Sequence, residues 1–350
     1  MWWHLTPARF LPLLLAAVAC TSAEPPDDSP RRIAYVDVRQ VPGGGTDVQL
    51  AIVNQDGTGY VQLATGVRDT PSPATAPDGH AIIYQGFAPN EYGVAWYSVS
   101  PDGGAPLDLQ MPSSVFSPLW SPNSRRVAWI NYENVSHLAV SAAGSSTVTN
   151  LTPDTVFVDP DATWAPDNSR LAALRRVNDQ NGPNWDLFTV TITGVLRPLV
   201  VSPGIYDGPP AWSPDGRTIA YTQPYTGDPA SGIYLVNPDG TNQRQLVRGY
   251  FDGFMSWSPD GKTIAFWGYR TGGGAPGLSL IDVASGEAGP ALSLPNYAFP
   301  AQRPWSRDGS LFLLTAQAPS GTAIYTLDRS GVLTQVTPDS ISAQTPSWVE

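Results

Sequence analysis

One phrase recurs along this chain at nearly constant spacing, and it limits the possible folds more than any other feature. Two complete copies, at 212–221 and 257–266, read Trp-Ser-Pro-Asp-Gly followed by a short apolar segment. Divergent copies begin at Trp120, Trp164 and Trp305, and a truncated copy ends the chain at Trp348. A seventh copy, at 75–84, has Thr75 in place of the tryptophan but keeps the turn and the apolar segment.

The spacing of these copies indicates a repeat architecture. From Thr75 to Trp348 the steps are 45, 44, 48, 45, 48 and 43 residues. A second turn series also has seven members, with glycine at positions 57, 103, 144, 194, 240, 286 and 331. Both series lie between alternating apolar runs, so each unit is predicted to hold four strands. A strand-based period of about 40–50 residues is typical of β-propellers.

The turns and the chain ends define the expected topology. Proline presets φ, aspartate caps the backbone and glycine accepts positive φ, so Ser-Pro-Asp-Gly reverses the chain. We expect an all-β chain forming a single propeller of four-stranded antiparallel blades. Seven blades are predicted, with six as the alternative if the unit at 164–200 or the first unit is irregular. The pattern opens with a second strand at 33–35 and ends with a first strand at 346–348. The C-terminal strand should therefore pair with the N-terminal blade and close the ring.

Composition agrees with one folded domain at 33–350. The 33 glycines and 36 prolines recur at turns between apolar strands, which is not a pattern of disorder. The net charge is −11, and Lys262 is the single lysine. This balance argues against binding nucleic acid, or anionic lipid through a basic face, and suits a cation or a partner with basic residues.

The N-terminal segment has a separate meaning. Arg9 precedes an apolar run at 10–19 that ends in small residues and is followed by Cys20. The run is too short to span a bilayer and reads as a secretory signal at 1–19. It resembles the signal of bacterial lipoproteins, which implies lipidation of Cys20, a flexible tether at 20–32 and an extracytoplasmic, membrane-anchored location in the cell envelope. The alternative is an ordinary signal that leaves this only cysteine free.

The repeat resembles a known group of proteins. Units of the form Trp-Ser-Pro-Asp-Gly-x-x-Ile-Ala-Phe/Tyr, with Ile-Tyr-Leu-Val-Asn-Pro-Asp-Gly at 233–240, are similar to the repeats of TolB-type propellers, relatives of the WD-repeat group. The resemblance implies a protein-binding propeller of the cell envelope. TolB itself carries an α/β domain ahead of a six-bladed ring, whereas here the ring directly follows the tether.

The sequence predicts no catalytic residues. It contains no Gly-x-Ser-x-Gly elbow, no His-Glu-x-x-His motif and no cysteine pair. Only His80 and His137 lie beyond the signal segment, in different units, so a histidine triad or a histidine metal cage is not expected.

One acidic constellation is a candidate binding site. Asp159, Asp207 and Asp252 share a register, five residues ahead of a repeat tryptophan, in three successive units. Loops entering the innermost strands lie at one mouth of a propeller channel. The candidate mouth also includes Asp69, Asp161, Tyr206, Tyr250 and Phe251. Carboxylates beside aromatic rings suit a hard cation or the basic side chains of a peptide. The alternative interpretation is that each aspartate caps its own loop.

The recurring tryptophans are interpreted as structural. Once per unit, Trp120, Trp164, Trp212, Trp257, Trp305 and Trp348 should fill the gap between adjacent blades, with each indole N–H bonded locally. Other tryptophans, at 96, 129, 185 and 267, fall outside this register and could be packing or surface residues.

Three functions remain open. The first is a lipid-anchored scaffold that binds an envelope protein or peptide. The second is a propeller enzyme of the lactonase, hydrolase or quinoprotein type with a cation, such as Ca²⁺, at the acidic mouth. The third is a glycan-binding propeller. Fold alone does not choose among them, and no cofactor is required by the first.

Overall fold

The computed structural model describes most of the chain beyond its N-terminal segment. The described residues are 30–68, 72–88, 93–112, 114–132, 136–153, 158, 162–179, 182–205, 208–223, 231–270, 277–290, 292, 294, 298–319 and 321–350. The chain divides into a unit at 1–30 and a compact unit at 31–350. The predicted signal segment, Cys20 and nearly all of the predicted tether lie outside the described residues. In the part that is described, no helix is long and apolar enough to cross a membrane.

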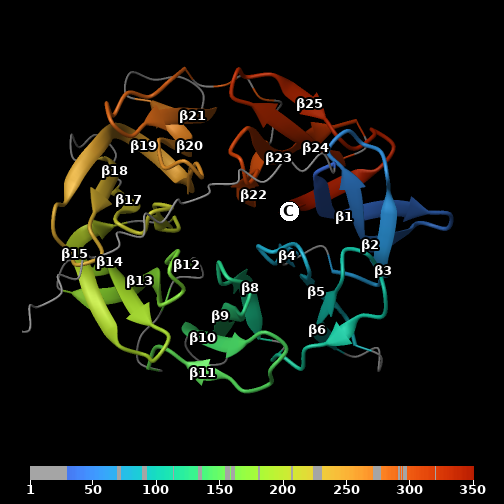
Figure 1. The fold of residues 1–350 in the computed structure, drawn as a ribbon, viewed down its shortest axis with the longest axis horizontal. Coiled ribbons are helices and arrows are strands. Elements are labelled where there is room, and N and C mark those ends of the chain that lie inside the picture. The colour runs from blue at the N-terminus through green and yellow to red at the C-terminus, as the bar shows by residue number, and fades with distance from the viewer. Residues whose placement is uncertain are drawn as a thin grey trace, which may run out of the picture. The chain divides into compact units, whose positions relative to one another are not determined.

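The unit at 31–350 is a ring of seven antiparallel β-sheet blades (Figure 1). Blade 1 holds β26 (Ser342–Val349), β1 (Arg32–Val41), β2 (Gly45–Asn54) and β3 (Val61–Thr65). Blade 2 holds β4 (Ala74–Thr75), β5 (Ile82–Phe87), β6 (Val94–Val99) and β7 (Leu107–Asp108). Blade 3 holds β8 (Val115–Trp120), β9 (Arg126–Tyr132), β10 (Ser136–Ala142) and β11 (Thr149–Asn150). Blade 4 holds β12 (Thr163–Trp164), β13 (Arg170–Asp179), β14 (Gly182–Thr191) and β15 (Leu196–Ile205).

Of the remaining three blades, blades 5 and 6 share one long strand, and blade 7 is a separate sheet. Blade 5 holds β16 (Ala211–Trp212), β17 (Ile219–Gln223), β18 (Gly232–Val236) and the first part of β19 (Arg244–Trp257). Blade 6 holds the second part of β19, β20 (Thr263–Arg270) and β21 (Gly277–Asp282), and Ala288 adds a bridge beside Ile281. Blade 7 holds β22 (Phe299–Trp305), β23 (Leu311–Ala318), β24 (Gly321–Asp328) and β25 (Leu333–Gln335). The all-β propeller of seven blades is therefore confirmed, and the six-blade alternative is wrong.

The ring closes through the two ends of the propeller, as predicted. β26 pairs antiparallel with β1, with Trp348 opposite Ile33 and Val349 opposite Arg32. In Figure 1 the red C-terminal strand lies beside the blue β1. Blade 1 thus joins β1 to a strand more than 300 residues later in the chain, and β1 has a partner on each edge.

The core consists of interfaces between neighbouring blades. Ile33 and Tyr35 of β1 pack toward blade 7, whereas Ala34 and Val36 pack toward blade 2. All four are buried because successive side chains of a strand point to opposite faces, and both faces of each blade are covered. This explains why the second strands read as continuous apolar runs and not as an alternating pattern.

The Ser-Pro-Asp-Gly turns are stabilised by their own side chains. The Ser213 hydroxyl donates to Asp215 Oδ1 at 2.6 Å and accepts the Thr218 N–H at 3.0 Å. Asp215 Oδ1 also accepts the Arg217 N–H at 3.0 Å, and these bonds lower the pKa of the Asp215 carboxyl. Gly216 has a φ of 69°, in the left-handed region that favours glycine. The turn aspartates are therefore positioned by local hydrogen bonds.

Two divergent turns replace that glycine and use the new side chain to contact a neighbouring blade. Ser124 and Asn168 have φ values of 56° and 62°. The Ser124 hydroxyl accepts the Asp78 N–H at 3.0 Å, and the Asn168 side chain accepts the Asn123 N–H at 2.9 Å. Each bond joins a turn to the turn of the preceding blade, which helps to offset the strain of a non-glycine residue at positive φ.

Candidate functional site: the central cavity

The repeat tryptophans link the innermost strands of adjacent blades. Five indole Nε1–H groups donate to a backbone carbonyl of the preceding blade: Trp120 to Ala74 (3.0 Å), Trp164 to Leu119 (3.1 Å), Trp257 to Ala211 (3.0 Å), Trp305 to Ser256 (3.4 Å) and Trp348 to Pro304 (2.9 Å). In every case the acceptor directly precedes the residue that occupies the repeat tryptophan position in the preceding blade, which is Thr75 in blade 2 and tryptophan in the others. The side chains that mark the repeat thus hold successive blades at one register.

Two seams of the ring lack this bond. Trp212 is 8% exposed, and its buried Nε1–H has no hydrogen-bond partner among the described residues, although Thr163 occupies the equivalent acceptor position in blade 4. In blade 2 the tryptophan is replaced by Thr75, whose buried hydroxyl also has no partner. The seams between blades 4 and 5 and between blades 1 and 2 are therefore held by packing without the indole bond.

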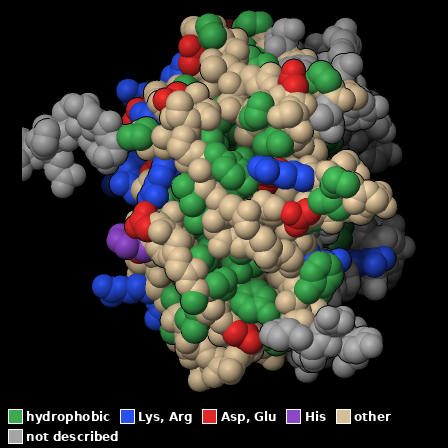
Figure 2. Space-filling model, turned by 90° about the vertical axis from the view of Figure 1, so that its right-hand side faces the viewer, with side chains coloured by type: hydrophobic (Ala, Val, Ile, Leu, Met, Phe, Trp, Pro, Cys, Tyr) green, Lys and Arg blue, Asp and Glu red, His purple; other side chains and the backbone are tan. Residues whose placement is uncertain are grey.

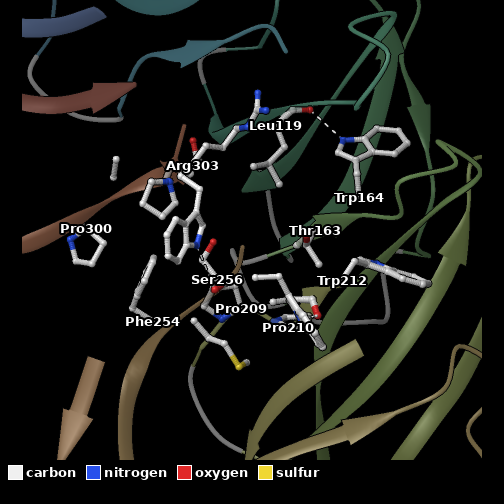
Figure 3. A pocket seen from close by; sticks show the side chains of 18 of the residues that line it. Leu119, Thr163, Trp164, Pro209, Pro210, Trp212, Phe254, Ser256, Pro300 and Arg303 are labelled. Carbon is white, nitrogen blue, oxygen red and sulfur yellow. Dashed lines mark hydrogen bonds between the residues drawn. The ribbon is translucent and has the colours of Figure 1, made fainter. Parts of the chain in front are cut away.

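The innermost strands surround a cavity of about 490 Å³. Five of the repeat tryptophans line it, namely Trp120, Trp164, Trp212, Trp257 and Trp305. Prolines at positions 209, 210, 300 and 304 add to the wall. An innermost strand has no neighbour on its channel side, so a proline there leaves no N–H donor unpaired. Figure 3 shows Trp212, Phe254 and Pro300 around this space.

Aromatic packing fixes one side of the cavity. The rings of Trp305 and Phe312 meet edge to face, with centroids 5.1 Å apart and an interplanar angle of 87°. The Arg329 guanidinium lies over the Trp305 ring, 5.5 Å from its centroid. Phe254 makes a second edge contact with Phe312, at 6.2 Å. These contacts restrain the indole and phenyl rings that face the ligand space.

Among the described lining residues, Arg303 of β22 is the one charged side chain. It points into the cavity in Figure 3 and is open to solvent there, although the walls of the ring surround it. The surrounding walls partly desolvate the Arg303 guanidinium and lower its pKa, the negative charge of Glu350 partly offsets the effect, and the positive charge of Arg307 adds to it. The cavity therefore combines apolar walls with one incompletely compensated cation.

Other cations lie on the outer surface of the propeller. Figure 2 shows many Lys and Arg side chains along its left edge. Several exposed cations directly follow the repeat turns, among them Arg125, Arg217 and Lys262. Arg217 and Lys262 each lie two residues after a turn aspartate, so charges of both signs mix at these two turns. Arg303 differs because aromatic and proline side chains surround it.

The predicted acidic mouth lies almost wholly outside the described residues. Asp69, Asp159, Asp161, Tyr206 and Asp207 are among the residues not described. The backbone of Tyr250, Phe251 and Asp252 lies within β19, where Tyr250 pairs with Tyr269 and Phe251 with Gly268. This segment is thus part of β19, and the register of β19 with β20 is irregular between Phe251 and Met255, where Asp252 lies. Within the described ranges no group of three or more His, Cys, Asp or Glu residues could hold a metal ion.

Two tryptophans outside the repeat register belong to the core. Trp96 and Trp129 are 0% and 1% exposed, and both pack in the interface of blades 2 and 3. His80, in contrast, is exposed at a turn, with its Nδ1 2.7 Å from the Asp78 carbonyl. His137 is buried on β10.

Sequence reasoning missed Arg303, although a signal was present. The residues two positions before the repeat position are Pro73, Pro118, Ala162, Pro210, Met255, Arg303 and Pro346. Six are apolar, and blade 7 alone places a charge at this register. The repeat was read for the residues its copies share, whereas this residue is a departure from the repeat.

Comparison with known proteins places this fold among diverse propellers. No family model matches the chain. TolB from Acinetobacter baumannii is 16% identical, with 91% of this chain and 82% of that chain covered and a TM-score of 0.56. An oligogalacturonate lyase in complex with manganese is 16% identical, with 88% and 85% covered and a TM-score of 0.61. The propeller domain of the Trilobed protease from Pyrococcus furiosus is 13% identical, with 88% and 92% covered and a TM-score of 0.64.

These similarities show the fold alone. For the fold, the resemblance to TolB-type propellers is confirmed. The Pyrococcus domain has an open velcro topology. This chain differs because β26 and β1 close its ring.

Proposed function

We propose that this chain is a binding protein of the bacterial cell envelope, in which the propeller holds a segment of a partner protein at its central cavity. The supporting observation is the cavity itself, about 490 Å³ of space walled by indoles and prolines and containing one cation. Sites for small ligands measure about 300–1,000 Å³ and combine apolar walls with a few placed polar groups. A peptide end or one anchoring side chain fits that range.

The walls of the cavity suit binding because their geometry is fixed in advance. Four lining indoles, those of Trp120, Trp164, Trp257 and Trp305, are held by hydrogen bonds to the preceding blade. Proline rings have a fixed φ and lose little freedom when a ligand arrives. Less side-chain entropy is therefore lost on association, which favours affinity for a given contact area.

The test is capture of a partner from native envelopes by wild type and by a variant with a narrowed cavity. Ala211→Leu/Ser256→Leu adds two side chains at the register where Leu119 already lines the wall, so the fold accommodates leucine there. Ala105→Leu/Ser146→Leu, at exposed positions, is the matched control. Loss of one specific cross-linked protein from the cavity variant alone supports the proposal. Equal capture by all three forms contradicts a binding role for the cavity.

The acidic mouth is a second docking candidate on the same protein. The variant Asp159→Ala/Asp207→Ala/Asp252→Ala enters the same capture experiment. A partner with basic residues that is lost from this variant would place part of the contact at the mouth. Retention of the partner would assign these aspartates to loop capping.

Membrane anchoring belongs to the proposal and has its own test. The apolar run before Cys20 and the acidic, proline-containing tether support a lipid at this cysteine. We expect a fatty-acid label to enter wild type and not Cys20→Ala, and the variant to move from the membrane fraction to the soluble fraction. A Cys20→Ala protein that stays membrane-bound would contradict the lipid anchor.

A further inference from the structure

Arg303 has the features of a ligand-binding residue that its own protein leaves unengaged. Its guanidinium makes no hydrogen bond or ion pair with any residue in the described part of the chain. The acid whose charge raises the pKa of Arg303 is Glu350, and its carboxylate contacts other residues. The Glu350 carboxylate accepts the Arg307 N–H at 2.5 Å and lies 3.6 Å from Arg31 Nε.

An unengaged cation on an apolar wall requires an explanation. Arg303 is exposed to solvent in the cavity, so its guanidinium is available to a ligand. The equivalent register in the other six blades holds proline, alanine or methionine, so the fold does not need a charge there. The arginine is therefore better explained by a partner that enters the cavity than by stabilisation of the ring.

We propose that Arg303 binds the carboxylate of a ligand whose apolar or aromatic part lies against the indole and proline wall; this inference rests on the proposed binding role of the cavity. One guanidinium neutralises one negative charge, which matches a carboxylate. A phosphate dianion would keep excess charge among apolar walls. The planar guanidinium can also donate two parallel N–H bonds to the two carboxylate oxygens. Such a carboxylate can come from a polypeptide chain end or from a small organic acid.

The experiment is calorimetric titration with acids and their uncharged counterparts. The probes are N-acetyl-leucyl-phenylalanine and its C-terminal amide, and benzoate and benzamide. We expect at least one acid to bind wild type about 10- to 100-fold more tightly than its amide, as charge-assisted hydrogen bonds predict. Arg303→Gln should remove that difference. Arg303→Lys should retain part of it, because the charge remains and the paired donors are lost.

Arg217→Gln is the matched control, since it removes one exposed positive charge outside the cavity lining. It should leave acid binding unchanged. The fold of Arg303→Gln is checked by its urea midpoint, which should be equal to or above that of wild type because no intramolecular bond is lost. Binding of the peptide acid alone indicates a chain end as the ligand, and binding of benzoate indicates a small acid.

Three results would overturn the inference: equal affinity for acid and amide, acid binding that survives in Arg303→Gln, or no saturable binding of either acid to wild type. The proposed function fails separately. If Arg303→Gln still captures the envelope partner, the cavity binds a protein without using a carboxylate. If acids bind through Arg303 but no partner is captured, the site takes small acids and the scaffold role is wrong.

Discussion

Replacing repeat tryptophans by phenylalanine should reveal how much the indole bonds stabilise the ring. Trp164, Trp212 and Trp348 share one register and are 7%, 8% and 7% exposed, so the loss of ring volume is similar in all three variants. Trp164 and Trp348 also lose a hydrogen bond to the preceding blade, whereas Trp212 has none to lose. The three variants therefore separate the bond from the packing.

The expected difference follows from the cost of an unmade hydrogen bond. Leaving a buried donor or acceptor unpaired costs about 1–3 kcal/mol. Trp164→Phe and Trp348→Phe should each lower the free energy of unfolding by about 1–3 kcal/mol more than Trp212→Phe, which also removes an unpaired buried N–H. Urea unfolding followed by circular dichroism measures this difference, provided that the m-value is unchanged.

Two outcomes would refute this reasoning. Equal destabilisation in all three variants would show that ring volume alone matters. A loss confined to Trp348→Phe would show that closure of the ring matters and the bond does not, because Trp164 lies in blade 4, away from the closure.

Three further predictions concern buried and turn residues. Burial raises the pKa of Tyr84 to about 12, so the folded state keeps a phenol neutral that the unfolded chain ionises near pH 10. Stability should be full below about pH 10 and fall as pH rises toward 12. Tyr84→Phe should reduce this fall in the urea midpoint, and a fall of the same size in the variant would contradict the prediction. Burial would raise the pKa of Asp308, but hydrogen bonds from Ser310 and Ser306 outweigh it and hold the pKa at about 2. The stability that the ionised Asp308 contributes is present above about pH 4 and is lost as pH falls through about 2. Asp308→Asn should therefore weaken the dependence of the urea midpoint on pH in acid, and an unchanged dependence would count against the prediction. Asp37 is fully buried and pairs with the half-exposed Arg39 at 2.5 Å. Asp37→Ala should lower the free energy of unfolding by about 1–3 kcal/mol, which is less than for a fully buried pair because water can reach the freed guanidinium. A urea midpoint equal to that of wild type would refute this contribution.

Most of the ring could be predicted from the sequence because its repeat uses strong local signals. The proline, aspartate and glycine of each turn specify a reversal independently of tertiary context, and seven such reversals at one period leave few alternatives. The continuity of β19 could not be predicted in this way. Its extended backbone passes Gly249 and changes partner from β18 to β20 without a turn. A change of partner depends on where the next blade lies, and no local residue pattern encodes that position.

The candidate site was predicted less well, for a related reason. The acidic register was visible because three units share it, and shared residues were the ones sought. Arg303 appears in one unit only. Its proposed role rests on its being the one charged side chain among the described residues that line the cavity, which is a property of the closed ring and not of any single repeat.

The pairing of β1 with both β26 and β2 has a consequence for the timing and the mechanics of this molecule. During synthesis β1 can pair with β2 early, but its other edge stays open until residues 342–349 have been made, so six blades can form before the first is complete. A force applied to the segment before Arg31 acts on β1. Because β1 is paired along both edges, such a pull must break its hydrogen bonds to β2 and to β26 together. The C-terminal strand β26, which is synthesised last, therefore helps β1 to resist the force.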